Sequence, residues 1–383
     1  GRDEAVEASK AQPYTPKLPL EIFDDEAMQR VYDDLRGIDN PFATFEEVGV
    51  VMAALVMEET DPKELERLLG HLDDAISPLL NSAALGPLNS ILRRLSLIAR
   101  NPSPQVPLRE GLLQNWFANL CKTQRLTLLA RAINSTWEDD WKGELFTFVY
   151  LQQLASFDEL IGFLNQVQPE EPRRVVIEAL LLLSDQNPKR FAHLTDDASP
   201  RLACDALFAL SRLEDPLTIN RICGTFKRPE SMVREAVINS LRDYQSPRIH
   251  RLMLDGLEDE DEDVRLAALR YLTVYTVKAA VEPISETIRT RAFMKRAFDE
   301  RRGWYIALGR IAGQDALPAL RKLAEAARGH EDIDEQTHLA LLGIRSIRNP
   351  KARQYLEGFA DSCRGELQLL TRKMLAERRG TSS

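Results

Sequence analysis

The chain has 383 residues, of which 44% are hydrophobic and 28% are charged. This composition excludes an intrinsically disordered protein and leaves room for two ordinary domains or for one elongated repeat array. The formal net charge of −9 argues against a general binder of nucleic acid or of anionic membranes.

The N-terminal part of the chain predicts a linker followed by helices. Residues 1–21 are polar and contain several prolines, which indicates a linker or a disordered segment. The apolar run Val48–Met57 is flanked by glutamates and is about half as long as a bilayer span, so it predicts a buried helix. Residues 22–165 predict a helical region, either divergent repeats of the array that follows or a domain docked on it.

The four cysteines are widely scattered, without a CxxC pair and without a histidine at ligand spacing. Three of them lie in apolar helical patterns, where a thiol packs as a small hydrophobic group. This usage favours a reducing, cytoplasmic location, and we expect no signal peptide.

From residue 172 onward the chain repeats a helical pattern at intervals of 30 to 36 residues. A leucine or isoleucine recurs seven residues after each starting position, usually with a small residue just before it. These offsets define one apolar helix face beside small residues that permit close packing. The starting positions are Arg173, Ala203, Arg234, Arg265, Arg301 and Thr337.

Another helix follows each of these. An N-capping residue followed by proline marks its start at Asp215–Pro216, Ser246–Pro247 and Asn349–Pro350. The two longer intervals predict longer helices, such as one over residues 277–297. The repeating unit is therefore a helical hairpin. Because one hairpin cannot bury both of its apolar faces, the predicted fold class is all-α, an α-solenoid of stacked hairpins.

The segments DEDVRLAALRYL and LSRLEDPLTI resemble HEAT repeats of the bacterial, PBS-lyase type. In that family the second helix of the hairpin opens with an acidic turn, then Val-Arg, then small residues and leucine. Residues 231–247 and 262–275 match best, whereas Ala203 and Thr337 replace the usual arginine. The resemblance covers roughly Pro172 to Leu356. We assign HEAT-like repeats to residues 166–383, ending in a capping helix at about residues 366–379.

Six consecutive carboxylates, from Glu258 to Asp263, run directly into one repeat. An EF-hand calcium loop needs glycine at its sixth position and glutamate at its twelfth, but counting from Asp259 these positions hold Val264 and Arg270. We therefore interpret the run as the turn and N-terminal cap of a helix, with the surplus carboxylates solvated. Weak, adventitious calcium binding is the alternative.

No set of residues predicts a metal, cofactor or catalytic site. The segment HEDIDEQTH (His330–His338) lacks the HExxH spacing and predicts a solvated loop with His338 exposed. The HLDD segment (His71–Asp74) lacks the further ligands of metal phosphohydrolases. The chain also has no phosphate-binding glycine loop and no nucleophile elbow. We expect a protein that is not an enzyme and that needs no cofactor.

Three of the four tryptophans, Trp116, Trp137 and Trp141, lie within 26 residues of the chain. Trp116 belongs to an apolar pattern and is predicted in the core. Trp137 and Trp141 are four residues apart and therefore share a helix face or flank a turn. They either pack in the core or form an exposed aromatic anchor for a partner.

Arginines recur at repeat positions that point away from both neighbouring helices. In HEAT-like stacks such positions lie on the concave surface, so the resemblance implies a basic inner face. Favourable interaction with helix C-terminal dipoles accounts for the members in a last turn, but less well for Arg270 and Arg302. We name these positions the arginine stripe, and its members are Arg212, Arg242, Arg270, Arg302, Arg310, Arg345 and Asn239.

The function that these patterns favour is a non-catalytic scaffold or adaptor in the cytoplasm. Its partner would be another protein, with an acidic or phosphorylated segment bound along the arginine stripe. Nucleic-acid binding on the stripe is an alternative that the resemblance permits, because some HEAT-like glycosylases cradle DNA, but the net charge of −9 argues against it. An enzyme regulator or a lyase-like HEAT protein is the second alternative.

Overall fold

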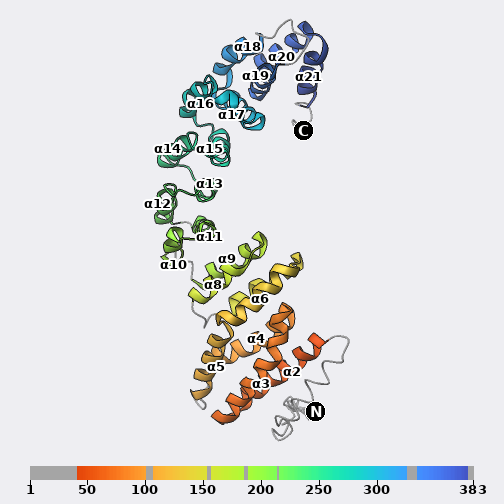
Figure 1. Ribbon diagram of the computed structural model, residues 1–383, viewed down its shortest axis with the longest axis vertical. Helices are drawn as coiled ribbons and strands as arrows, with labels where there is room; N and C mark the ends of the chain where they lie inside the picture. Colours follow the sequence, from red (N-terminus) through yellow and green to blue (C-terminus); the bar gives the residue numbers. More distant parts are fainter. Residues whose placement is uncertain are drawn as a thin grey trace, which may run out of the picture. The chain divides into compact units, whose positions relative to one another are not determined.

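The computed structural model describes residues 41–100, 107–152, 157–184, 189–213, 215–325 and 334–377 (Figure 1). All regular secondary structure in these ranges is helical. Contacts within the chain divide it into two compact units, unit 1 (Gly1–Asp185) and unit 2 (Gln186–Ser383). The linker predicted over residues 1–21 lies outside the described residues, and the division predicted between residues 165 and 166 stays a prediction.

Unit 1 contains two rows of helices. In one row α2, α4, α7 and α9 pack each against the next, and α3, α6 and α8 form the other. The additional helix α5 packs against α3 and α4. The bounds are α2 Pro41–Glu58, α3 Pro62–Asn81, α4 Leu85–Arg100, α5 Pro107–Leu120, α6 Thr123–Thr136, η2 Asp139–Trp141, α7 Lys142–Leu151, α8 Phe157–Gln166 and α9 Glu170–Leu183.

The apolar run of residues 48–57 lies in α2, as the sequence predicts. One side of the helix is buried through Met52, Ala53 and Val56, while Val51 on the opposite side is 39% exposed. The helix is therefore half-buried rather than enclosed. No helix of the described ranges is both long and apolar enough to cross a membrane.

Unit 2 has the same two-row construction. Its inner row consists of α11 (Pro200–Ser211), α13 (Ser231–Ser240), α15 (Glu262–Val274), α17 (Phe298–Ala312) and α19 (Glu335–Ser346). Its outer row consists of α12 (Pro216–Thr225), α14 (Pro247–Gly256), α16 (Val281–Ile288) and α18 (Leu317–Glu325). The remaining elements are α10 Lys189–Ala192, η3 His193–Asp196, η4 Lys278–Ala280, η5 Phe293–Lys295, η6 Gly313–Ala316, α20 Pro350–Ser362 and α21 Gly365–Glu377.

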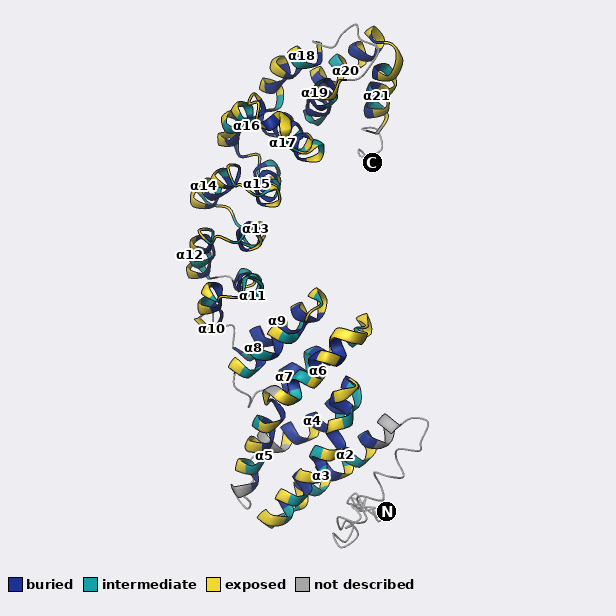
Figure 2. Ribbon diagram, viewed as in Figure 1, coloured by how far each residue is buried: buried dark blue, intermediate teal, exposed yellow. Residues whose placement is uncertain are grey.

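The two rows of unit 2 are not packed equally. Each inner-row helix packs against the next, whereas the outer-row helices pack chiefly against the inner row. A stack that is tighter along one row curves toward that row, so the inner row lines the concave side of unit 2 (Figure 1). Buried residues concentrate where the two rows face each other (Figure 2).

The predicted helix starts are confirmed. The side chains of Asp215, Ser246 and Asn349 accept hydrogen bonds from backbone N–H groups in the first turns of α12, α14 and α20, each with proline at the start of the helix. The side chains satisfy N–H groups that have no partner inside the helix, and proline has no such group to satisfy. Ser199 and Asp61 cap α11 and α3 in the same way.

The single long helix predicted over residues 277–297 is wrong. The chain instead forms η4, α16 and η5 in succession. After α16 ends, the Thr290 hydroxyl accepts a hydrogen bond from the Phe293 backbone N–H, which closes a turn. This turn places Phe293, which is fully buried, against Trp304 and Tyr305 of α17. Burial of the ring stabilises the bend at the expense of a continuous helix.

Candidate protein-interaction surface

Three buried arginines, at the starting positions of the repeat in α13, α15 and α17, join the inner-row helices to one another. Each guanidinium pairs with a carboxylate from the next inner-row helix or from the turn before it, although each arginine is less than a tenth exposed. We call this series the arginine ladder. Its pairs are Arg234 with Asp259, Arg265 with Glu300 and Arg301 with Glu335.

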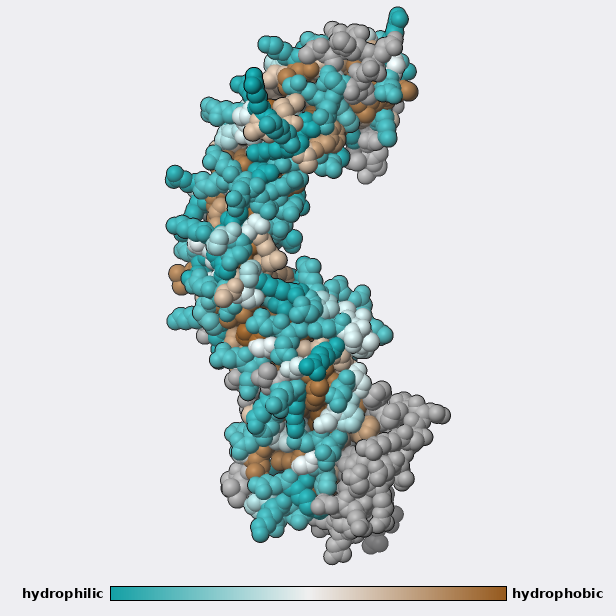
Figure 3. Space-filling model, viewed as in Figure 1, coloured by the Kyte–Doolittle hydropathy of each residue, from teal (hydrophilic) through white to brown (hydrophobic). Residues whose placement is uncertain are grey.

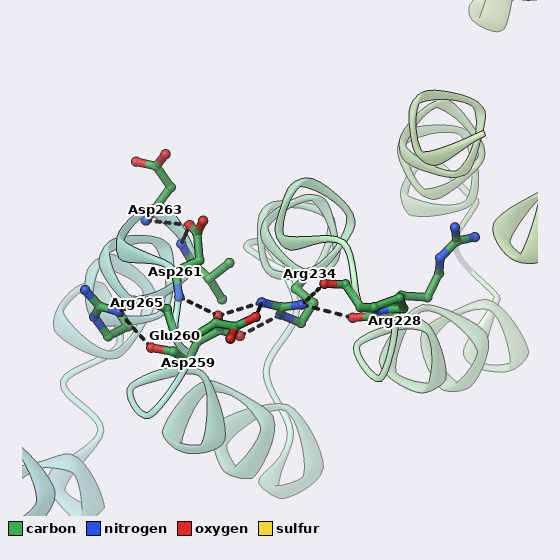
Figure 4. Close-up of polar contacts among 9 residues, drawn as sticks. Arg228, Arg234, Asp259, Glu260, Asp261, Asp263 and Arg265 are labelled. Carbon is green, nitrogen blue, oxygen red and sulfur yellow. Dashed lines mark hydrogen bonds and ion pairs between the residues drawn. The ribbon is translucent and has the colours of Figure 1, made fainter. Parts of the chain in front are cut away.

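Arg234 shows how one ladder position works (Figure 4). Its Nε and Nη2 atoms donate to the two carboxylate oxygens of Asp259, at 2.7 and 2.9 Å. Its Nη1 atom donates to the carbonyls of Arg228 and Pro229, in the turn before its own helix. One side chain therefore closes a turn in its own repeat and holds the turn of the next repeat through a charge-assisted, two-bonded contact.

Arg265 repeats this geometry one helix further along. It donates to both oxygens of Glu300 at 2.7 and 2.9 Å, and to the carbonyls of Asp259 and Glu260 at 2.8 and 2.7 Å. The Glu300 side chain is only 1% exposed and also accepts a bond from Arg296 at 2.8 Å. The carboxylate is buried with its charge fully paired, as burial in a protein interior requires.

In the two repeats that lack the arginine, other side chains make the hydrogen bonds at this position. Ala203 stands at the ladder position of α11, and there Arg228 donates through Nη1 to the carbonyls of Thr195 and Asp197, in the turn before that helix. The rest of the Arg228 guanidinium pairs with Glu230, and its hydrogen bonds lower the pKa of that carboxyl to about 2.

At Thr337 the ladder ends. The buried Thr337 hydroxyl donates at 2.7 Å to Asp334, the residue that caps the start of α19. Threonine is too short to reach the following repeat, so α20 and α21 join the stack through packing and local hydrogen bonds.

The acidic run at residues 258–263 has two different roles. Asp261 caps α15 by accepting hydrogen bonds from the N–H groups of Asp263 and Val264 at 2.9 and 3.3 Å, which confirms the predicted cap. The prediction of solvated surplus carboxylates is wrong for Asp259, whose side chain is 7% exposed beside Arg234. Burial alone would raise the pKa of Asp259, but hydrogen bonds from Arg234 and the Asp261 N–H lower it.

The opposite ends of the inner-row helices are tied together by a second set of bonds. The Tyr244 hydroxyl donates to the carbonyl of Ser211, and the Tyr275 hydroxyl donates to that of Arg242. Lys278 donates to the carbonyl of Ile311, at the end of α17. These side chains satisfy carbonyls at helix C-termini and so fix neighbouring helix ends relative to one another.

The arginine stripe lies on the inner row, outside the packed core. Arg212, Arg242, Arg270, Arg302, Arg310 and Asn239 are exposed, and Arg345 is half-buried. Arg212, Arg242, Arg310 and Arg345 lie in the last turn of their helices or directly after it, whereas Arg270 and Arg302 lie within theirs. The helix dipole therefore does not account for the last two.

The stripe is only partly neutralised. Arg242 lies 3.3 Å from Asp243 and Arg302 lies 3.8 Å from Asp299, and all four side chains are well exposed. The Asn239 side chain donates to Glu235.

Other stripe arginines make contacts of a different kind. Arg212 lies over the Phe208 ring at 5.0 Å, and Arg270 donates to the carbonyl of Leu266 in its own helix. Within the described ranges, Arg270 and Arg310 have no acidic partner.

The histidine-rich segment is partly helical. Residues 330–333 lie outside the described residues, but Asp334 caps α19 and Glu335 to His338 form its first turn. The predicted exposure of His338 is wrong, because its ring is half-buried 5.5 Å from that of Phe298. Burial and the charge of Arg302 lower the pKa of His338. No cluster of metal-binding side chains occurs in the described part of the chain.

The tryptophans of unit 1 divide as the sequence allows. Trp116 is buried, which confirms its predicted place in the core. Trp137 and Trp141 are half-buried and contact each other edge to face, with ring centroids 6.2 Å apart. They pack on each other without being enclosed.

A family model described as HEAT repeats matches residues 187–273 of this chain. No curated protein matches it. A crystal structure of an engineered protein is similar over 92% of this chain and 94% of its own, at 13% sequence identity and a TM-score of 0.36. The matched residues extend from α10 to α15, which contain the first complete ladder pair. The chain is thus an all-α solenoid, and its residues 187–273 are similar to HEAT repeats.

Proposed function

We propose that this protein is a non-catalytic scaffold that binds a partner protein through the arginine stripe. In agreement with the resemblance to bacterial, PBS-lyase-type HEAT repeats, the proposal describes a bacterial, cytoplasmic adaptor without lyase activity. The partner contributes an acidic or phosphorylated segment, because guanidinium groups pair well with carboxylates and phosphates.

The observation that carries the proposal is the placement of the stripe cations. Each of the five inner-row helices presents at least one, and none of them takes part in the arginine ladder. Concave faces of solenoids are extended binding surfaces. Arg270 has neither a helix end nor a carboxylate partner among the described residues to explain its charge.

The test is quantitative capture of partner proteins by the full chain, with the wild type compared to the double variant R270E/R310E. The matched control is R289E/R291E, which makes the same charge change at exposed arginines directly after the outer-row helix α16. Capture of a specific partner should fall at least tenfold for the stripe variant and stay unchanged for the control.

Two results would contradict the proposal. Equal capture by the wild type and the stripe variant would show that the stripe is not the contact. Retention of duplex DNA by the wild type at moderate salt, lost in the stripe variant, would assign the stripe to nucleic acid instead. Circular dichroism melts of all three proteins should coincide, because every substituted side chain is exposed.

A further inference from the structure

One stripe arginine from each inner-row helix forms a regular series across unit 2. The series is Arg212 on α11, Arg242 on α13, Arg270 on α15, Arg310 on α17 and Arg345 on α19. Four of these lie at helix C-terminal ends, and Arg270 lies about one turn earlier in its helix. The last residue of α15 is the exposed, uncharged Val274. Arg270 is therefore the member of the series that lies on α15.

The helix ends that carry this series are held in place by bonds between neighbouring helices. The carbonyl of Arg242 accepts a bond from Tyr275, and the carbonyl of Ile311, next to Arg310, accepts one from Lys278. The carbonyl of Ser211, next to Arg212, accepts one from Tyr244. These backbone segments are therefore already ordered before a ligand binds. This reduces the conformational entropy that is lost on binding.

The side chains between the arginines offer little apolar surface to a ligand. Val274 is exposed, but Phe208, Leu266 and Ile306 are half-buried, and Leu342 is buried. On the face that the space-filling view shows, hydrophilic side chains predominate over unit 2 (Figure 3). A docked amphipathic helix requires a continuous apolar groove, which these residues do not form.

We infer that the partner segment is an extended acidic stretch that crosses the five inner-row helices with a carboxylate at every third residue. This inference rests on the proposed function. Packed helices lie about 8–10 Å apart, and an extended polyproline-type chain advances about 3.1 Å per residue. Three residues of such a chain therefore span about one helix spacing, and about 13 residues reach from Arg212 to Arg345.

An extended segment of this type also suits the surface chemically. Its backbone carries no internal hydrogen bonds and remains solvated, so it needs no row of backbone-binding groups on the protein. The contacts are exposed ion pairs, and Asp243 already competes for Arg242 at 3.3 Å. Binding should accordingly weaken as salt is raised.

The test measures binding of labelled synthetic peptides to the full chain by fluorescence anisotropy at low salt. The first peptide is five Glu-Pro-Ala triplets. The second has the same composition with its glutamates in one block, and the third is an alanine-rich helix with glutamate at every seventh residue. The triplet peptide should bind at least tenfold more tightly than either, and R270E/R310E should reduce its affinity at least tenfold.

The variant R289E/R291E should bind the triplet peptide as the wild type does. Substitution D243N should tighten binding, because it releases Arg242 from its carboxylate. Unchanged affinity in D243N would contradict the pairing at Arg242.

Equal affinity for the triplet and block peptides would overturn the spacing while leaving the stripe as a binding surface. Tighter binding of the helical peptide would overturn the extended conformation. If none of the peptides binds, the inference fails, and the capture experiment decides separately whether the scaffold function fails with it.

Discussion

Glu300 is almost wholly removed from water, and Arg265 and Arg296 pair with its carboxylate. Moving such a charge into a protein interior is costly, and the two guanidinium groups offset that cost. The cluster therefore contributes little net free energy to folding, whereas removal of one partner destabilises the protein strongly. This asymmetry makes ladder residues sensitive to substitution although they touch no ligand.

We predict that Glu300→Ala lowers the free energy of unfolding of unit 2 by about 3–5 kcal/mol, because it leaves Arg265 buried without a carboxylate. The measurement is a urea titration followed by circular dichroism. The matched control is Glu357→Ala, which removes the carboxylate of the half-exposed pair with Arg353 and should cost about 0.2–1 kcal/mol. Similar losses in the two variants would contradict the role of burial.

Asp259 gives the arginine ladder a dependence on pH. Its pKa is lowered in the folded protein, so the unfolded chain binds a proton at a higher pH than the folded one does. The stability that Asp259 contributes is thus fully present above the unfolded pKa of about 4 and is lost as the pH falls through the lowered folded value.

We expect the stability difference between the wild type and Asp259→Asn to be largest above about pH 5 and to narrow below about pH 4. Urea midpoints measured at several pH values check this. Glu258→Gln serves as the control, since Glu258 is exposed and pairs with no guanidinium group in the described chain. A constant difference across the range would show that Arg234 does not favour the ionised form.

At the scale of the helix, α17 and α19 of the inner row approach each other closely. A Cβ atom added at Gly309 would lie 2.1 Å from the carbonyl oxygen of Gly343, so the two backbones meet where neither residue has a side chain. The sequence pattern places a small residue at Gly343 and thereby predicts close packing there. Gly309, two positions further along its own repeat, was not predicted, because the other repeats carry larger residues at that offset.

We predict that Gly309→Ala destabilises the protein by about 1–3 kcal/mol or more through overpacking of α17 against α19. The control is Gly358→Ala within α20, where the added methyl group meets nothing within 4 Å. That change should stabilise the helix by about 0.5–1 kcal/mol, since alanine restricts the unfolded chain more than glycine does. Thermal melts that move in the same direction for both variants would contradict the close contact.

The helical periodicity, the caps and the HEAT-like repeats were predictable because each depends on residues close together in sequence. Asp215 and Pro216 suffice to start α12. In α15, Val264 and Leu272 suffice to define the buried face of the helix. The break after α16 was not predictable in this way, because it depends on the burial of Phe293 against α17. The arginine ladder was missed for the same reason, since its partners lie 25 and 35 residues apart.

The candidate surface was predictable in its location but not in its detail. Repeat offsets identify positions that point away from neighbouring helices, and the stripe residues lie outside the core as expected. Nothing in the offsets shows that Asp243 and Asp299 lie beside two of the arginines, or that tyrosine hydroxyls fix the helix ends. Binding by the stripe stays a prediction.

At the scale of the whole molecule, the chain divides into two compact units. In unit 2 the contacts run mostly between one helix and the next along the row. The stability of such a stack is approximately the sum of the intrinsic stability of each repeat and the energies of the interfaces between neighbouring repeats. A substitution that destabilises one repeat therefore affects its neighbours more than distant helices.

Hydrogen exchange followed by mass spectrometry should reveal this locality. In Glu300→Ala we expect faster exchange in α15 and α17, a smaller increase in α13 and α19, and no change in α3 and α4 of unit 1. A uniform increase over both units would indicate that the whole chain unfolds as one cooperative block.

The arginine ladder has a direction, since every arginine points to an acid that comes later in the chain. The acids occupy different positions in their repeats, because Asp259 lies in the turn before α15 whereas Glu300 and Glu335 lie within α17 and α19. Duplication or deletion of a whole repeat would bring an arginine to an acid at a different position, so a change in the length of the array requires a rebuilt junction. At Thr337 the hydroxyl bonds to Asp334 of its own repeat, so a repeat inserted after it would need a different kind of junction.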